Sequence, residues 1–205
     1  IAIRMPSSMI ARKFIKLSGV PIAAPSANIS GSPSPTGFEH VSSDFDGKIP
    51  CILKGPASRF GLESTVVDCT GKHPVILRPG VFTLEELKKI DRLAKIRKSS
   101  LKIKSPGQKY NHYSPDARVK LITNYELRIK NKKTITAFIG LNKKYSKIFE
   151  FVKICRSNEE YAKNLFSFFR ECDKRGIKTI YCEKVQEKGI GLAIMNRLKK
   201  ASAKT

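Results

Sequence analysis

Apolar residues recur at helical spacing in several parts of the chain and predict four helices. Two of these begin with a capping box, Thr83 with Glu86 and Ser157 with Glu160, in which each side chain satisfies a free backbone amide. Gly19 is expected to end the first helix. The predicted helices cover residues 8–18, residues from Thr83 onward, residues 157–176 and residues 192–201.

Short apolar runs between these helices predict strands. They are residues 1–4, 22–24, 50–53, 64–69, 75–77, 119–122, 135–139, 149–155 and 178–182. The alternation of strands and helices indicates an α/β fold. The first residues, 1–4, are already strand-like, which suggests that the strand starts before Ile1. Residues 1–97 are therefore expected to form only part of a domain. Residues 117–205 are predicted to form a small complete α/β domain.

Residues 98–116 show no periodicity and are interpreted as a linker, because Pro and Gly are frequent between Ser105 and Pro115. The rings of Tyr110, His112 and Tyr113 lie within four residues of sequence. Such a density of rings is unusual for a passive spacer, and at least one of them is expected to face the first domain.

The chain is strongly basic, with 40 Lys and Arg against 17 Asp and Glu and a net charge of +23. One interpretation is a surface that faces RNA. The other is lysine on ordinary solvated faces, since Lys outnumbers Arg and aromatic residues are not interleaved with it as stacking platforms. Charge alone supports only non-specific binding of nucleic acid.

The five cysteines are widely spaced and include no C-x-x-C pair, which argues against both a disulfide framework and a zinc site. The three histidines show no ligand spacing either. No stretch resembles a signal peptide or a transmembrane helix, so we expect a cytoplasmic protein with reduced thiols and no membrane partner. Walker, Rossmann, zincin and G-x-S-x-G motifs are absent from the sequence.

Three polar loops follow or precede predicted strands, at 25–36, 63–66 and 78–80. Loops at strand ends are the usual place for ligands in α/β sheets. Their hydroxyl and amide groups suit phosphate or carboxylate oxygens, and Arg78 suits bidentate contact with an oxyanion. The alternative is that the serines cap turns and Arg78 pairs with a surface carboxylate.

Five motifs occur in the order found in one known family. The segments Ala24–Gly31, Glu63–Asp68 and Leu77–Gly80 resemble the YrdC-like domain, whereas Ser105–Pro115 and Gly189–Leu198 resemble the linker and the end of the Sua5 branch of that family. The resemblance covers the whole chain. It implies part of a twisted, open-sheet YrdC-like domain, a linker, and a small Rossmann-like C-terminal domain.

The family is L-threonylcarbamoyladenylate synthase, a nucleotidyltransferase. The resemblance implies that ATP, L-threonine and bicarbonate are consumed, with Mg²⁺ bound to the nucleotide, and that pyrophosphate is released. The product supplies the threonylcarbamoyl group that other proteins later place on adenosine 37 of tRNA. RNA or tRNA and these downstream transfer proteins are therefore further expected partners.

The resemblance also implies roles for individual residues, none of them as a catalytic group or a metal ligand. ATP is expected to contact Ser26, Ser34, Arg78 and Tyr110. Threonine is expected to contact Arg4, Ala24 and Ser64. Asn28 and His112 are further possibilities, and Tyr110 and His112 would act from the linker as a lid that becomes ordered with nucleotide.

The sequence departs from the family at two places. Gln108 and Asn111 stand where the family linker commonly has Met and a basic residue. The family's Thr-Asp-Thr-x-Tyr-Gly loop and Lys-x-Arg pair have no counterpart, so we expect an N-terminally incomplete enzyme that is inactive as these residues alone. Two other hypotheses remain, a double-stranded RNA or tRNA-binding module without catalysis and an inactive fragment.

Overall fold

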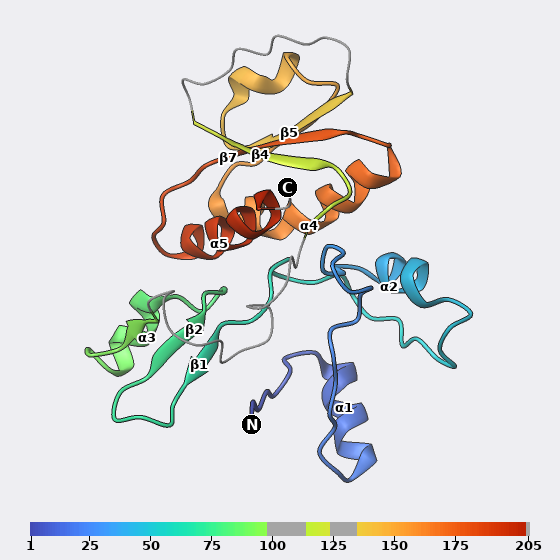
Figure 1. Cartoon of the computed structure of the whole chain (residues 1–205). Coiled ribbons are helices and arrows are strands. Elements are labelled where there is room, and N and C mark those ends of the chain that lie inside the picture. Colours follow the sequence, from blue (N-terminus) through green and yellow to red (C-terminus); the bar gives the residue numbers. More distant parts are fainter. Residues whose placement is uncertain (98–113, 124–134, 204–205) are drawn as a thin grey trace.

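The computed structural model describes residues 1–97, 114–123 and 135–203, and it has the predicted mixed α/β fold (Figure 1). A small sheet in the first part joins β1 (Val66–Asp68), β2 (Val75–Arg78) and β3 (Lys95–Ile96) in that order. The first pair is antiparallel and the second is parallel. Helix α3 (Leu84–Ile90) packs on this sheet through a small core of Ile76, Leu87 and Ala94.

Helix α3 begins with the capping box predicted from the sequence. The Thr83 hydroxyl accepts from the Glu86 N–H, and the Glu86 carboxylate accepts from the Thr83 N–H. Helix α1 (Met9–Ser18) also has its predicted bounds, with Ser8 as its N-cap and Gly19 in the left-handed conformation at its end. Local sequence signals therefore predict where both helices begin.

Helices α1 and α2 (Phe38–Phe45) lie apart from the small sheet (Figure 1). Helix α1 buries none of its residues, and Phe14 and Leu17 on its apolar side remain largely exposed. Helix α2 was not predicted, and it buries a carboxylate, Asp44, rather than an apolar side chain. The apolar periodicity used to predict helices therefore carries little signal for α2.

Three predicted strands, residues 1–4, 22–24 and 50–53, are wrong. None of them lies in a strand of the described chain. A strand requires backbone hydrogen bonds to a neighbour, and these segments pair with no other described segment. Most of their apolar residues also stay exposed, as Ile3 does with 90% of its surface accessible.

The second part has a four-stranded sheet, whose strands form at the four predicted apolar runs. It consists of β4 (Arg118–Ile122), β5 (Thr136–Gly140), β6 (Phe151–Ile154) and β7 (Thr179–Glu183), in the order β4-β7-β5-β6. All three strand pairs are parallel. Helices α4 (Asn158–Lys174) and α5 (Ile190–Ser202) lie together on one side of this sheet (Figure 1).

The main core lies between this sheet and the two helices. Successive residues of β5, one of the two interior strands, face opposite sides of the sheet. Ile139 belongs to the core under α4 and α5, and Phe138 belongs to a smaller core on the other face. The short 3₁₀ helix η1 (Lys143–Lys147) supplies Tyr145 to that smaller core. The predicted apolar face of α4 is buried throughout, at Tyr161, Leu165, Phe168, Phe169 and Cys172.

The second predicted capping box is only half correct. The Ser157 hydroxyl accepts from the Glu160 N–H as expected. The Glu160 carboxylate, however, accepts from the N–H of Arg156, 2.8 Å away, instead of the N–H of Ser157. A carboxylate one turn into a helix can reach more than one free amide, and the chain path before the helix decides which one it binds.

Candidate functional site

Two of the predicted site residues meet at the edge of the small sheet. Arg78, at the end of β2, pairs in register with Val66 at the start of β1, which places it beside Ser64. The Arg78 guanidinium donates two hydrogen bonds to the Ser64 carbonyl, at 3.2 Å from Nε and 2.9 Å from a terminal nitrogen. The candidate ATP and threonine residues on these two segments are therefore in direct contact.

Gly80 allows the two segments to approach closely. A Cβ at this position would lie 2.3 Å from the backbone nitrogen of Thr65 and 2.7 Å from the carbonyl oxygen of Glu63. Real Cβ atoms do not come so close to backbone atoms, so any side chain here would push the segments apart. The sequence indicated a turn at 78–80 but not this contact.

Ser34 joins the same cluster through Glu63. Its hydroxyl donates a hydrogen bond to one oxygen of the Glu63 carboxylate. The other carboxylate oxygen accepts from Nε of Arg197 at 2.9 Å. Ser34, Ser64 and Arg78, which lie far apart in sequence, are thus brought together around residues 63–64.

Arg197 is the functional candidate that the sequence reasoning missed. It lies on α5, its side chain is fully buried, and it also donates to the carbonyls of Pro79 at 2.6 Å and Glu63 at 3.4 Å. Arg197 lies within the tail motif and Glu63 within another motif, so the residue types were visible in the sequence. Their pairing across 134 positions was not.

The cluster carries an excess of positive charge. Burial, together with the nearby charges of Arg197 and Arg78, lowers the pKa of Lys200 to about 8, against the opposing effect of Glu63. Three cationic side chains therefore lie near one carboxylate. Such an arrangement can stabilise an anionic ligand.

The other predicted threonine and ATP residues that the structure describes form no hydrogen bond or ion pair with this cluster. Arg4, Ala24 and Ser26 are exposed and lie outside helices and strands. No ion pair connects Arg4 to another described residue. Asn28 fastens its own loop, where its side-chain nitrogen donates to the carbonyls of Ile29 and Ser32. Tyr110 and His112 lie outside the described residues.

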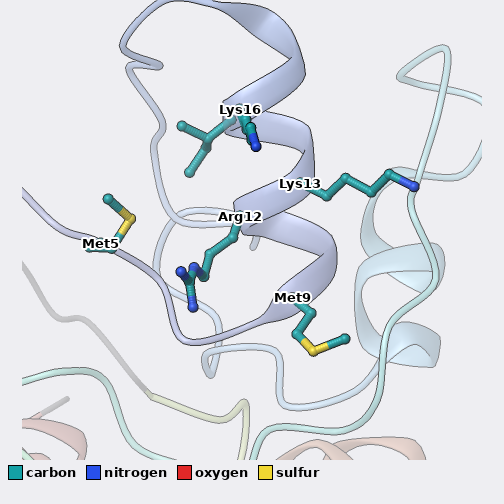
Figure 2. A pocket seen from close by; sticks show the side chains of 6 residues that line it. Met5, Met9, Arg12, Lys13 and Lys16 are labelled. Atoms are coloured by element: carbon teal, nitrogen blue, oxygen red, sulfur yellow. The ribbon is translucent and has the colours of Figure 1, made fainter.

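A hollow lies beside α1 (Figure 2). It is lined by Met5, Met9, Arg12, Lys13, Ile15 and Lys16. None of the predicted site residues is among them. The hollow therefore gives no support to the predicted ATP or threonine contacts.

Two of the five cysteines, Cys51 and Cys69, are exposed, and the other three are buried. The buried ones are Cys155, Cys172 and Cys182, and burial raises the pKa of the Cys155 thiol to about 12. Within the part of the chain that the structure describes, no three His, Cys, Asp or Glu residues are grouped to hold a metal ion. No helix there is long and apolar enough to cross a membrane.

Comparison with known proteins assigns the two parts separately. A family model described as "Threonylcarbamoyl-AMP synthase, C-terminal domain" matches residues 82–203. A model for the Sua5, YciO and YrdC proteins, described as "Telomere recombination", matches residues 1–80. The second match begins at residue 1, so it does not confirm the expectation that part of the domain precedes Ile1.

Curated relatives are similar over almost the whole chain. Threonylcarbamoyl-AMP synthase of Pyrococcus abyssi is 45% identical over 98% of this chain, which covers 64% of that protein. The Bacillus subtilis protein of the same name is 37% identical over 98% of this chain, which covers 63% of it. The chain thus spans somewhat less than two thirds of these relatives.

Solved structures agree with the sequence comparison. The crystal structure of P. abyssi Sua5 complexed with L-threonine has a TM-score of 0.86 and 44% identity, covering 97% of this chain and 63% of that one. A variant of the same protein gives a TM-score of 0.85. Together, the family matches and these relatives show that the chain belongs to the Sua5 branch of the Sua5/YciO/YrdC family.

Proposed function

We propose that the protein acts in the synthesis of L-threonylcarbamoyl-AMP from ATP, L-threonine and bicarbonate. The observation that carries this proposal is the meeting of Ser34, Ser64 and Arg78 around Glu63. This cluster lies in a chain whose fold matches a Sua5 protein complexed with L-threonine, at a TM-score of 0.86.

The proposed roles divide the cluster between two substrates. Ser34 and Arg78 contact ATP, together with Ser26 and Tyr110. Ser64 contacts threonine, with Arg4 forming a salt bridge to the threonine carboxylate and the backbone of Ala24 lining the pocket. The two hydrogen bonds from Arg78 to the Ser64 carbonyl support this division. They hold the proposed ATP-binding residue and the proposed threonine-binding residue at a fixed distance from each other.

The proposed reaction has two steps. The threonine amine first takes up the carbon of bicarbonate to form a carbamate, with loss of water. A carbamate oxygen then attacks the α-phosphorus of ATP, the bond to the β-phosphate oxygen breaks, and pyrophosphate leaves with that bonding pair. Positioning and charge neutralisation do most of the work in such chemistry, and Arg78 supplies positive charge beside the cluster. Mg²⁺ arrives with ATP as part of the substrate.

The product would then pass to other proteins. Its mixed anhydride is an activated acyl group that a tRNA-modifying system can transfer to adenosine 37. We propose that this transfer takes place in the cytoplasm, with tRNA and threonylcarbamoyl-transfer proteins as downstream partners. The basic charge of the chain is compatible with contact to RNA.

The test is pyrophosphate release by the protein expressed from its complete reading frame. Release is expected only when ATP, Mg²⁺, L-threonine and bicarbonate are all present. The variant Arg78→Ala is expected to raise the KM for ATP or abolish release, and Arg92→Ala, an exposed change outside the cluster, serves as the control. Release that is independent of threonine would contradict the proposal.

A further inference from the structure

The C-terminal domain holds the loop that carries Ser34. Helices α4 and α5 lie on the side of their sheet that faces the first part of the chain (Figure 1). From α4, the Arg170 guanidinium donates two hydrogen bonds to the Pro33 carbonyl, at 2.7 and 3.0 Å. The backbone just before Ser34 is therefore tied to the second domain.

Arg170 is itself held by a nearly buried carboxylate. It forms a bidentate pair with Asp44 of α2, with N–O distances of 2.7 and 3.0 Å and about 10% of each side chain exposed. The hydrogen bond from Arg170 keeps the pKa of Asp44 below its usual value. A bidentate pair of this kind restricts the guanidinium in both position and plane.

From α5, Arg197 determines the orientation of Glu63. The Arg197 side chain is fully buried, so its charge requires a counter-ion, and Glu63 provides it. One Glu63 oxygen faces Arg197 and the other faces Ser34. The carboxylate therefore has one orientation that satisfies both partners.

This arrangement decides which hydrogen bonds Ser34 can still make. A serine hydroxyl has one proton to donate and two lone pairs that accept. An ionised carboxylate only accepts, so the Ser34 proton must point to Glu63. Toward any further ligand, Ser34 can then act only as an acceptor. A phosphate oxygen without a proton is an acceptor too and cannot bind there.

We propose that Arg197 is a positioning residue that acts through Glu63, so that Ser34 accepts a hydrogen bond from an N–H or O–H group on the adenosine part of ATP. The partner is the base amino group or a ribose hydroxyl, not a phosphate oxygen. This inference rests on the proposed function, and it adds the chemical group that Ser34 recognises and the dependence of that recognition on the C-terminal domain.

The test compares ATP with three analogues that each lack one donor. These are 2′-deoxy-ATP, 3′-deoxy-ATP and the purine riboside triphosphate without the base amino group. One of the three is expected to bind the unsubstituted protein about tenfold more weakly than ATP, or weaker still. With Ser34→Ala, ATP is expected to bind as weakly as that analogue, and the difference between the two should disappear.

Substitutions at Arg197 separate positioning from general structural support. Arg197→Met is expected to abolish the same discrimination between ATP and that analogue. The exposed change Arg175→Met, which removes a pair with Glu171 and a contact with the Phe151 ring, should preserve it. If Arg197→Met does not fold, the double variant Glu63→Met/Arg197→Met removes both charges together and avoids an unpaired buried ion. It too is expected to lose the discrimination. A purely structural role would change affinity for ATP and the analogues equally.

Three results would overturn the proposal. If Ser34→Ala still binds ATP more tightly than the analogue, by the same factor as the unsubstituted protein, then Ser34 accepts no hydrogen bond from that donor. Loss of discrimination in Ser34→Ala but not in Arg197→Met or the double variant would show that Arg197 does not position it. No ATP binding by the unsubstituted protein would overturn the proposed function as well, so the two failures are distinguishable.

Discussion

Gly80 has no side chain, and two segments of the candidate site meet over it. The backbone nitrogen of Thr65 and the carbonyl of Glu63 occupy the space that a Cβ would need. Arg78 lies two positions before Gly80, and Ser64 lies next to Thr65 on the other segment. The hydrogen bonds between Arg78 and the Ser64 carbonyl depend on this close approach. Gly80, which has no side chain, thus controls the distance between the segments that carry Arg78 and Ser64.

Gly80→Ala is therefore expected to weaken binding of both ATP and threonine. Moving backbone atoms apart costs the Arg78–Ser64 hydrogen bonds, which are worth about 1.5–3 kcal/mol when the donor is charged. Titration calorimetry with each ligand measures the effect. Gly71→Ala is the matched control, since the nearest atom to its added Cβ is 3.9 Å away. Equal affinities in both variants would show that the spacing is not required.

Lys200 provides a pH-dependent test of the charge cluster. Its pKa is about 8 in the folded protein, against 10.5 for an ordinary lysine, so the unfolded chain holds the proton more tightly. Between these values the unfolded state binds more protons, and the Lys200 contribution to stability rises with pH. The unfolding free energy of the unsubstituted protein relative to Lys200→Met is therefore expected to increase from about pH 8 to pH 10.5.

Urea denaturation across this range measures the increase. Lys199→Met is the control, because Lys199 is about half exposed and pairs with Glu187 at the surface. A pH dependence that is the same in Lys200→Met and in the unsubstituted protein would mean that Lys200 is not desolvated beside Arg78 and Arg197.

At the scale of elements, the sequence predicts helices better than strands. Helix α3 and helix α1 have their start signals within the segment itself, at Thr83 and Ser8, and both form where expected. Residues 22–24 and 50–53 have strand-like composition but no partner among the described residues. Strand formation depends on a neighbouring strand that is often distant in sequence, and a local pattern carries no information about that neighbour.

The candidate site shows the same limit. The family resemblance indicated Ser34, Ser64 and Arg78, and the structure brings these three together. The link from Ser34 through Glu63 to Arg197 could not be predicted, because it joins two domains across a long stretch of chain. Conversely, the resemblance implies roles for Arg4, Ala24 and Ser26, but in the described part of the chain they form no hydrogen bond or ion pair with this cluster, and their roles stay predictions.

Gly61 is where the first part of the chain touches α4. A Cβ on Gly61 would lie 2.3 Å from the carbonyl oxygen of Lys163 on that helix. The next residue, Leu62, is buried in the core of the second domain. This short segment therefore connects the residues of the candidate site to α4.

Gly61→Ala is expected to loosen this connection and raise the KM for ATP. The control is Gly47→Ala, because Gly47 has a φ of 72° against 73° for Gly61 but no atom within 4 Å of its added Cβ. The two variants share the backbone strain and differ only in the contact with α4. Limited proteolysis and ATP titration measure the effect, and equal behaviour of the two variants would contradict a role for the contact.

At the scale of the whole molecule, the net charge of +23 leaves RNA binding as the rival function. If RNA binding is the primary activity, affinity for a duplex RNA should fall steeply with salt and should not respond to ATP. If the protein is a synthase, we expect weak, non-specific RNA binding with the same salt dependence, and saturable ATP binding that depends on Arg78. Filter binding over a series of salt concentrations, with and without ATP, distinguishes the two.

The most direct test of the account follows one carbon atom from bicarbonate into the product. The protein from its complete reading frame is incubated with ATP, Mg²⁺, L-threonine and bicarbonate labelled with carbon-13, and the nucleotides are analysed by mass spectrometry. We predict an adenylate that carries threonine and the labelled carbon, formed together with pyrophosphate and lost in Arg78→Ala. A product of AMP alone, or an adenylate of threonine without the label, would contradict the proposed reaction.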